Sequence, residues 1–370
     1  MSADRRIPFV DLRPGEDAAA VRAAIDRVIE RGWFVLGPEV DAFEAEFAAA
    51  CGARHAVGVG SGTDAIALLL RAAGVGPGDE VLVPAMTAGY TALAVVATGA
   101  VPVFVDVEPD TLTIDARACE QMVTPRTRAV VPVHLYGQAA AMDAVAAVAS
   151  RHALAVVEDC CQAHLATRQG QAVGTAAGGG AFSFYPTKNL GAIGDGGAVI
   201  TGDAAIASRV RRLRNGGQAD RYHHVEAGVN SRLDELQAAV LRARLPLLPA
   251  WTERRRALAA AYRAALPALV RTIPERDPGH VYHLFPIRSD DRDGLRAHLA
   301  AAGVEALVHY PVALPAQPAF AAGGGSGRCP EAARAAGELL SLPLNPRLSE
   351  ADVRRVAAAV GDYPKGHLPA

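Results

Sequence analysis

Short apolar runs alternate with alanine-rich segments through the N-terminal half of the chain. The runs cover residues 55–59, 80–84, 101–107, 128–135, 154–159, 181–185 and 197–201. Several of them are apolar without alternation, which is typical of strands covered on both faces. The alanine-rich segments include residues 63–73 and 142–152, where the spacing predicts helices. This βαβα order predicts an α/β fold around a mostly parallel, doubly wound central sheet.

The second half of the chain has a different pattern. A helical pattern rich in Arg, Leu and Ala covers residues 233–266 and is interrupted near Pro246 and Pro249. A strand and two helices are then expected over residues 281–287, 293–302 and 331–340. We therefore predict a large domain over residues 1–250, which includes the N-terminal segment, and a smaller C-terminal α+β domain over residues 251–370.

The composition is that of a globular protein, with 51% hydrophobic and 21% charged residues among 370. The net charge of -2 is spread evenly, so no basic stripe indicates nucleic acid or an anionic membrane. The N-terminus has no apolar signal segment, and the apolar stretch 91–105 is too short to span a bilayer. The five cysteines form no metal-ligand spacing, so we expect no metal site and a cytoplasmic, reducing location.

Lysine is almost absent from the chain. Of 37 basic side chains only Lys188 and Lys365 are lysine, and Lys365 lies in a polar tail. Lys188 lies among apolar residues, glycines and small polar residues. Arginine stays protonated in proteins, whereas a desolvated lysine amine can lose its proton and attack a carbonyl. Lys188 is therefore a candidate nucleophile, and an ordinary loop lysine is the alternative.

The sequence VGVGSGTDAIALLL predicts a strand, a glycine-rich turn and a helix. Gly62 and Thr63 would present backbone N–H groups at the start of this helix, where a phosphate binds favourably. The spacing matches neither the Walker A motif nor GxGxxG, so it does not indicate a nucleoside triphosphate or a dinucleotide. A structural turn with a Ser/Thr cap is the alternative.

The segment LAVVEDCCQAH places Glu158 and Asp159 at the carboxyl end of an apolar strand, where open α/β sheets bind their ligands. A carboxylate there can hold the proton of a cationic ring nitrogen, and the amide of Gln162 can contact a ring substituent. An ordinary helix cap at Asp159 is the alternative.

The segment FSFYPTKNLGAIGDGG supplies Ser183 on a strand and Lys188 in the loop after it. Its glycines permit an unusual backbone path around the lysine. A phosphate cup, an acid at a strand end and a buried lysine together meet the needs of pyridoxal 5'-phosphate (PLP): an anchor, a partner for the ring nitrogen and a Schiff-base lysine.

Four motifs, GSGTDA, EDCCQAH, FSFYPTKNLGAIGDGG and GVNSRLDELQAA, resemble those of the DegT/DnrJ/EryC1/StrS family of fold-type-I, PLP-dependent sugar aminotransferases. The similarity runs from PFVDL near the N-terminus to SLPLNP near the C-terminus. It implies that Lys188 carries the cofactor and moves the proton, and that Asp159 binds the pyridine nitrogen beside Gln162. It also implies a set of phosphate ligands: Gly62, Thr63 and Ser183.

The resemblance further implies a homodimer with shared active sites, because Asn230 would reach the phosphate of the neighbouring subunit. Arg232, His309 and Tyr310 would lie near a nucleotide-sugar substrate. The residues alone leave other roles open, namely a salt-bridge partner for Arg232 and packing for His309 and Tyr310.

Three departures from the family pattern concern the cofactor ring and the substrate. Ala88 stands where an aromatic residue commonly stacks on the PLP ring, and Tyr90, two positions later, is a candidate replacement and substrate contact. Two cysteines replace the alanines that commonly precede the glutamine of EDCCQAH. In the loop after Tyr310, Ala313 and Pro315 replace a proline and a histidine that are common in the family.

The resemblance implies transfer of an amino group from L-glutamate to a nucleotide-linked 3- or 4-keto-6-deoxy sugar, in amino-sugar biosynthesis for secondary metabolites. A keto-cyclitol aminotransferase of the scyllo-inosose type is one alternative. A catalytically degenerate regulatory protein is another. A PLP-dependent sugar dehydratase of this family would have His at position 188, so Lys188 argues against that activity.

Overall fold

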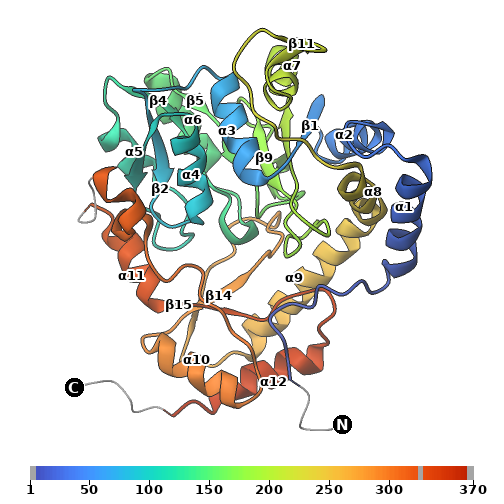
Figure 1. Ribbon diagram of the computed structural model, residues 1–370. Helices are drawn as coiled ribbons and strands as arrows, with labels where there is room; N and C mark the ends of the chain where they lie inside the picture. The colour runs from blue at the N-terminus through green and yellow to red at the C-terminus, as the bar shows by residue number, and fades with distance from the viewer. Residues whose placement is uncertain (1–5, 324–327, 365–370) are drawn as a thin grey trace.

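The computed structural model describes residues 6–323 and 328–364 (Figure 1). Lys365 and most of the Gly-rich loop around residue 325 lie outside these ranges. The predicted α/β architecture is confirmed. In Figure 1 the C-terminal portion, drawn in orange and red, lies beneath the sheet of the N-terminal portion, and α9 (Leu248–Ala265) runs between them.

The central sheet is built from the apolar runs of the N-terminal half. Its strands are β1 (His55–Val59), β2 (Glu80–Pro84), β3 (Val101–Val105), β4 (Thr127–Val130), β5 (Ala155–Val156), β6 (Glu158–Asp159), β9 (Gly180–Ser183) and β10 (Gly197–Thr201). One half has the order β3-β2-β4-β5 and the other β1-β10-β9-β6. The chain through β5 and β6 and a parallel bridge from Val133 to Asp159 join the halves. In the described sheet only β10 runs antiparallel to its neighbours, as a mostly parallel sheet requires.

Helices cover both faces of this sheet, so β2 and β10 are buried along their whole length. The helices are α1 (Ala18–Arg31), α2 (Pro38–Ala50), α3 (Gly62–Ala72), α4 (Gly89–Ala97), α5 (Ala116–Met122), α6 (Met142–Arg151), α7 (Ala204–Leu213) and α8 (Glu235–Arg244). Polar caps fix where several of them begin. Ser61 caps α3 by accepting a hydrogen bond from the Asp64 N–H, and Asp203 caps α7.

The C-terminal portion contains a small antiparallel sheet. After α8, η2 (Leu245–Leu247) leads into α9, and the sheet comprises β13 (Arg271–Thr272), β14 (Phe285–Arg288) and β15 (Leu339–Leu342). This portion also contains the helices α10 (Arg292–Ala301), α11 (Pro330–Glu338) and α12 (Glu350–Gly361). Residue 250 lies inside α9, and Ile7 of the N-terminal segment pairs with Val304. The division of the chain at residue 250 stays a prediction.

Two element boundaries differ from the sequence-based expectation. The strand expected over 281–287 begins only at Phe285, because Tyr282 has a φ of 46°, which extended backbone does not allow. The helix expected over 331–340 ends at Glu338, because Leu339 and Leu340 pair with β14.

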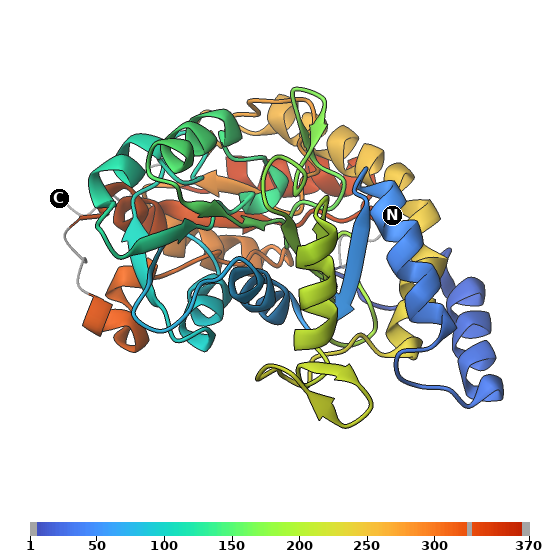
Figure 2. The ribbon, with the colours of Figure 1, turned by 90° about the horizontal axis from the view of Figure 1, so that it is seen from above.

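The remaining elements are short. They are β7 (Thr167–Arg168), β8 (Gln171–Ala172), β11 (Gln218–Asp220), β12 (His223–His224), η1 (Leu135–Gly137), η3 (Leu314–Ala316) and η4 (Pro318–Gly323). Figure 2 shows the hairpin of β11 and β12 projecting from the body beyond the end of α7. Within the described ranges, no helix combines the length and apolarity needed to cross a membrane.

Candidate active site

Asp159 is a buried carboxylate at the carboxyl end of β6. Its side chain is 4% exposed. One oxygen accepts a hydrogen bond from the Thr91 hydroxyl at 2.8 Å and the other from the Cys161 N–H at 3.0 Å. Among the described residues it forms no salt bridge, although a buried carboxylate is costly without a cationic partner. Asp159 therefore suits a ligand that brings a positive charge, such as a protonated pyridine ring.

The glycine-rich turn before α3 forms a tight cup against β9. A Cβ atom at Gly62 would lie 2.6 Å from the Ser183 Cβ and 2.8 Å from the Cys161 Sγ, so only glycine fits. The first N–H groups of a helix have no partner within the helix, and those of Gly62 and Thr63 begin α3. This cup brings together the predicted phosphate residues Gly62 and Ser183.

Lys188 lies in the loop after β9, where its backbone N–H donates to the Tyr185 carbonyl at 2.8 Å. Its side chain is partly buried, and its amine forms no hydrogen bond or ion pair with any described residue. Burial lowers the pKa of Lys188, and the nearby Cys161 and Asp159 oppose this shift. A lowered pKa increases the fraction of free amine, which is the nucleophilic form.

The residue after Lys188 ties this loop to the C-terminal portion. The Asn189 side chain donates to the Val281 carbonyl at 2.9 Å, and its oxygen lies 3.2 Å from the His283 Nδ1. Because the amide nitrogen is already a donor, the Asn189 oxygen is free to accept from this imidazole. Asn189 therefore ties the loop that carries Lys188 to the segment at residues 281–283.

Three histidines near Lys188 are held neutral. Burial, with a smaller contribution from the Lys188 cation, lowers the pKa of His164 to about 3 and that of His309 to about 4. The same two causes place the pKa of His283 well below its usual value. The surroundings of the amine are therefore free of competing cationic imidazoles at neutral pH.

Gln162, His309 and Tyr310 form one hydrogen-bonded group with Tyr136. The Gln162 side-chain oxygen accepts from the Tyr136 N–H at 2.7 Å, and its nitrogen donates to the Tyr310 hydroxyl at 2.9 Å. The Tyr136 hydroxyl donates to the His309 carbonyl. Burial raises the pKa of Tyr310 to about 12, so its hydroxyl keeps its proton. The structure thus places the predicted substrate residues His309 and Tyr310 beside the predicted ring residue Gln162.

Other predicted residues lie apart from this group. Asn230 is exposed and its backbone pairs with Asn215, whose side chain accepts from Arg232 at 2.9 Å. Tyr90, at the start of α4, is 67% exposed and therefore does not fill the space of a ring-stacking residue inside this subunit. Their assigned roles stay predictions.

Glu158, next to Asp159, has a structural role. It accepts hydrogen bonds from the Gly174 and Ala176 N–H groups and lies 3.0 Å from the His134 Nε2. His134 and Glu158 lie close to Cys160, within 4.8 Å between their ligand atoms. Glu158 therefore anchors the loop around residues 174–176.

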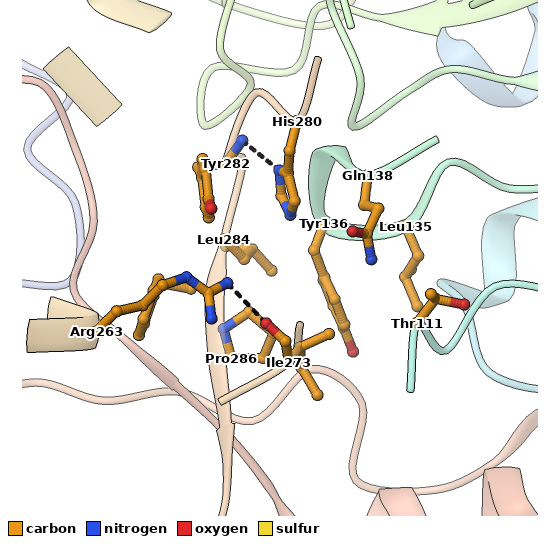
Figure 3. Close-up of a pocket in the computed structure, with 11 residues that line it drawn as sticks. Thr111, Leu135, Tyr136, Gln138, Arg263, Ile273, His280, Tyr282, Leu284 and Pro286 are labelled. Atoms are coloured by element: carbon orange, nitrogen blue, oxygen red, sulfur yellow. Dashed lines mark hydrogen bonds between the residues drawn. The ribbon is translucent and has the colours of Figure 1, made fainter. Parts of the chain in front are cut away.

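Two cavities of very different size lie near these residues. The larger, of about 830 Å³, is lined by Lys188, by N-terminal residues 10–17 and by α9. The smaller, of about 10 Å³, has room for roughly one water molecule. Figure 3 shows it between Tyr136, His280, Tyr282 and Arg263, where the His280 imidazole accepts from the Tyr282 N–H. Of these two cavities, only the larger is big enough for a substrate.

Sequence reasoning missed Thr91 and Tyr136. Thr91 lies in the first turn of α4, within the PAMTAGYTAL stretch that already departs from the family pattern. Tyr136 follows the run that contains β4, at the same edge of the sheet as Asp159. A search of every strand's carboxyl end, rather than of motifs alone, would have found Tyr136.

The described residues fit PLP. The Gly62 cup is closed to any side chain. Within the described part of the chain, the buried Asp159 carboxylate has no salt bridge and the Lys188 amine has no partner. These are the three anchors that the cofactor needs for its phosphate, its ring nitrogen and its aldehyde.

Comparison with known proteins agrees with this site. A family model described as the DegT/DnrJ/EryC1/StrS aminotransferase family matches residues 16–361. The dTDP-3-amino-3,4,6-trideoxy-alpha-D-glucose transaminase of Streptomyces venezuelae is 50% identical over 366 residues, which are 97% of this chain and 96% of that protein.

Solved structures show the same relationship. The crystal structure of S. venezuelae DesV in complex with a ketimine intermediate has a TM-score of 0.92 and 50% identity, and the match covers 96% of this chain and 97% of that one. NtdA from Bacillus subtilis with bound cofactor PMP has a TM-score of 0.90 and 30% identity, over 98% of this chain and 87% of that one.

The chain belongs to the DegT/DnrJ/EryC1/StrS aminotransferase family. The expectations of a fold-type-I architecture, of transaminase activity and of PLP as cofactor are confirmed. The degenerate regulatory protein and the keto-cyclitol enzyme are not favoured.

Proposed function

We propose that this aminotransferase moves an amino group from L-glutamate to a nucleotide-linked keto sugar, a 3- or 4-keto-6-deoxyhexose, in amino-sugar biosynthesis. The observation that carries the proposal is the partly buried Lys188, whose amine has no partner among the described residues, close to the buried Asp159 carboxylate. The 50% identity with a dTDP-sugar transaminase over nearly the whole of both chains supports the choice of acceptor.

Bound PLP supplies an electron sink that stabilises the carbanion formed when the amino group moves. In this chain, Asp159 keeps a proton on the ring nitrogen because its carboxylate is buried and needs a positive partner. The Thr91 hydroxyl and the Cys161 N–H hold that carboxylate in one orientation.

Lys188 would hold the cofactor by its aldehyde, and its amine, when free, would move the proton from the donor carbon to the neighbouring position. Its lowered pKa favours the unprotonated amine, which is the form that accepts a proton. The N–H groups of Gly62 and Thr63 and the Ser183 hydroxyl hold the phosphate, so the ring stays fixed while the substrate changes. The same residues serve both half-reactions, which gives ping-pong kinetics.

The active unit in this proposal is a homodimer in the cytoplasm. Asn230 is exposed in the subunit, which leaves it free to reach the phosphate site of a second copy. Apolar side chains are exposed in the same region and in the loop before α2: Trp33, Phe34, Val35, Val225 and Val229. Burial of these residues against a second copy would stabilise the dimer. Arg232, His309, Tyr310 and Tyr90 are the proposed contacts to the nucleotide sugar.

A substrate panel tests this function. The purified protein is supplied with PLP, L-glutamate and a set of dTDP- and UDP-linked keto sugars together with scyllo-inosose, and aminated products are detected by mass. We expect amination of at least one nucleotide sugar. Activity with the inosose alone would instead assign the keto-cyclitol reaction.

A further inference from the structure

The larger cavity has an unusual excess of arginine on its walls. It lies between the N-terminal segment, the loop that carries Lys188, and α9; in Figure 1 the N-terminal segment, drawn in dark blue, passes across α9. Five arginines and Lys188 line the cavity, against three carboxylates, Asp11, Glu16 and Asp17. The cavity therefore carries a net positive charge.

The three carboxylates are already engaged by other side chains. Asp11 pairs with Arg13 and Arg347, and Asp17 pairs with Arg244 at 2.8 Å. Glu16 accepts a hydrogen bond from the indole of Trp251 at 2.6 Å. The remaining arginines of the cavity, Arg254 and Arg255, have no carboxylate within 4.0 Å among the described residues.

Arg255 is the more unusual of the two, because it is 6% exposed. Its Nη1 donates to the carbonyls of Tyr282, His283 and Leu344 at 3.2, 3.4 and 2.9 Å, and its buried Nε has no partner among the described residues. Backbone carbonyls satisfy some N–H groups but leave the charge of a buried guanidinium uncompensated. Burial lowers the pKa of Arg255 to about 10, which still leaves it protonated at neutral pH.

Arg254 extends the same wall toward solvent. It is partly buried, and the one hydrogen bond recorded for it goes to the Leu348 carbonyl at 2.7 Å. A guanidinium offers five N–H donors in a planar fork that matches a carboxylate or a phosphate group. Arg254 therefore has donors to spare for a ligand in the cavity.

We propose that Arg254 and Arg255 form an oxyanion subsite, which binds a carboxylate of the amino-acid donor or the diphosphate of the nucleotide sugar in the cavity that Lys188 lines. The identity of these two substrates rests on the proposed function. The subsite would hold the anionic end of one substrate while its reacting end lies near Lys188, since both line one cavity.

Calorimetric titration of the PLP-loaded dimer with two unreactive probes tests the subsite. Glutarate represents the carboxylates of the donor, and dTDP represents the nucleotide. We expect Arg254→Gln to weaken the binding of one probe on the order of 10- to 100-fold, the loss for a hydrogen bond to a charged group. Arg255→Lys, which keeps the charge but loses the fork, is expected to weaken the same probe. Arg256→Gln is the matched control, because Arg256 is the next residue of α9, bonds to Glu253 and the His280 carbonyl, and does not line the cavity.

The affected probe identifies the substrate whose anion is held. Binding of both probes within twofold of wild type in Arg254→Gln and Arg255→Lys overturns the proposal, and so does a wild-type protein that binds neither probe. If Arg255→Lys does not fold, as judged by thermal unfolding, Arg254→Gln decides. This test does not depend on the outcome of the substrate panel. If the panel shows no turnover of a nucleotide sugar, the effect of Arg254→Gln on glutarate binding can still be measured.

Discussion

Gly62→Ala is expected to damage the phosphate cup through one added methyl group. The new Cβ would lie 2.6 Å from the Ser183 Cβ and 2.8 Å from the Cys161 Sγ. Carbon atoms pack at about 3.5 to 4.0 Å, so the start of α3 must move away from β9 by roughly 1 Å. The Ser183 Cβ is fixed to the backbone of β9, so a side-chain rotation cannot relieve this contact. Overpacking of this kind costs about 1 to 3 kcal/mol of unfolding free energy.

The same displacement moves the N–H groups of Gly62 and Thr63 away from the phosphate. Loss of one hydrogen bond to a charged group raises the dissociation constant of PLP about tenfold or more. Denaturant unfolding of the cofactor-free protein measures the first effect, and titration of the cofactor-free protein with PLP, followed by visible absorbance, measures the second.

Two further variants make the test specific. Gly337→Ala is the matched control, because a Cβ at that position in α11 meets no atom within 4 Å, and we expect it to be neutral or slightly stabilising. Ser183→Gly removes the nearest clash. The double variant Gly62→Ala/Ser183→Gly should therefore have an unfolding free energy on the order of 1 kcal/mol higher than the sum of the two single effects predicts. A Gly62→Ala protein with wild-type stability and wild-type affinity for PLP would refute the assignment of the cup.

Two other predictions concern Asp159 and the buried histidines. Asp159→Asn should lower kcat on the order of 100- to 1,000-fold, because a neutral amide does not hold the ring proton, while Thr91→Val should have a smaller effect of the same kind; unchanged kcat in Asp159→Asn would contradict this role. Burial lowers the pKa of His280 and of His164 from 6.5 to about 3 in the folded chain. Between these two pH values, each histidine therefore binds a proton in the unfolded chain but not in the folded chain. The unfolding free energy should therefore fall as the pH falls below 6.5, by about 1.4 kcal/mol per pH unit for each histidine. Urea unfolding at several pH values checks this, and His280→Gln should reduce the slope; an unaltered slope would mean that His280 is not held neutral.

The sequence predicted the central sheet well because its strands are buried on both faces. Runs such as 80–84 and 197–201 are apolar throughout, and local pattern was sufficient to place them. Leu339 and Leu340 were misassigned because they continue a helical pattern locally, while their strand depends on pairing with β14, which is distant in sequence. Tyr282 was misassigned because a single residue with positive φ leaves no trace in an apolar pattern.

The residues of the candidate site also differ in whether the sequence alone could predict them. Lys188, Asp159 and Gly62 could be predicted because each belongs to a motif with its own chemical reason. Thr91 and Tyr136 could not, because their roles arise from contacts with Asp159 and Gln162 that only the folded chain provides. The proposed role of Asn230 involves a second subunit, so neither the sequence nor a single subunit tests it.

Identification of the lysine that binds PLP tests the central claim most directly, and the chain makes this experiment unusually clear because it contains only Lys188 and Lys365. Borohydride reduction of the PLP-loaded protein, followed by digestion and mass spectrometry, should find the phosphopyridoxyl group on Lys188. Lys188→Ala should lose both the label and transamination of L-glutamate, while Lys365→Arg should keep both. A label on any other group, or a Lys188→Ala protein that still transaminates, would contradict the account.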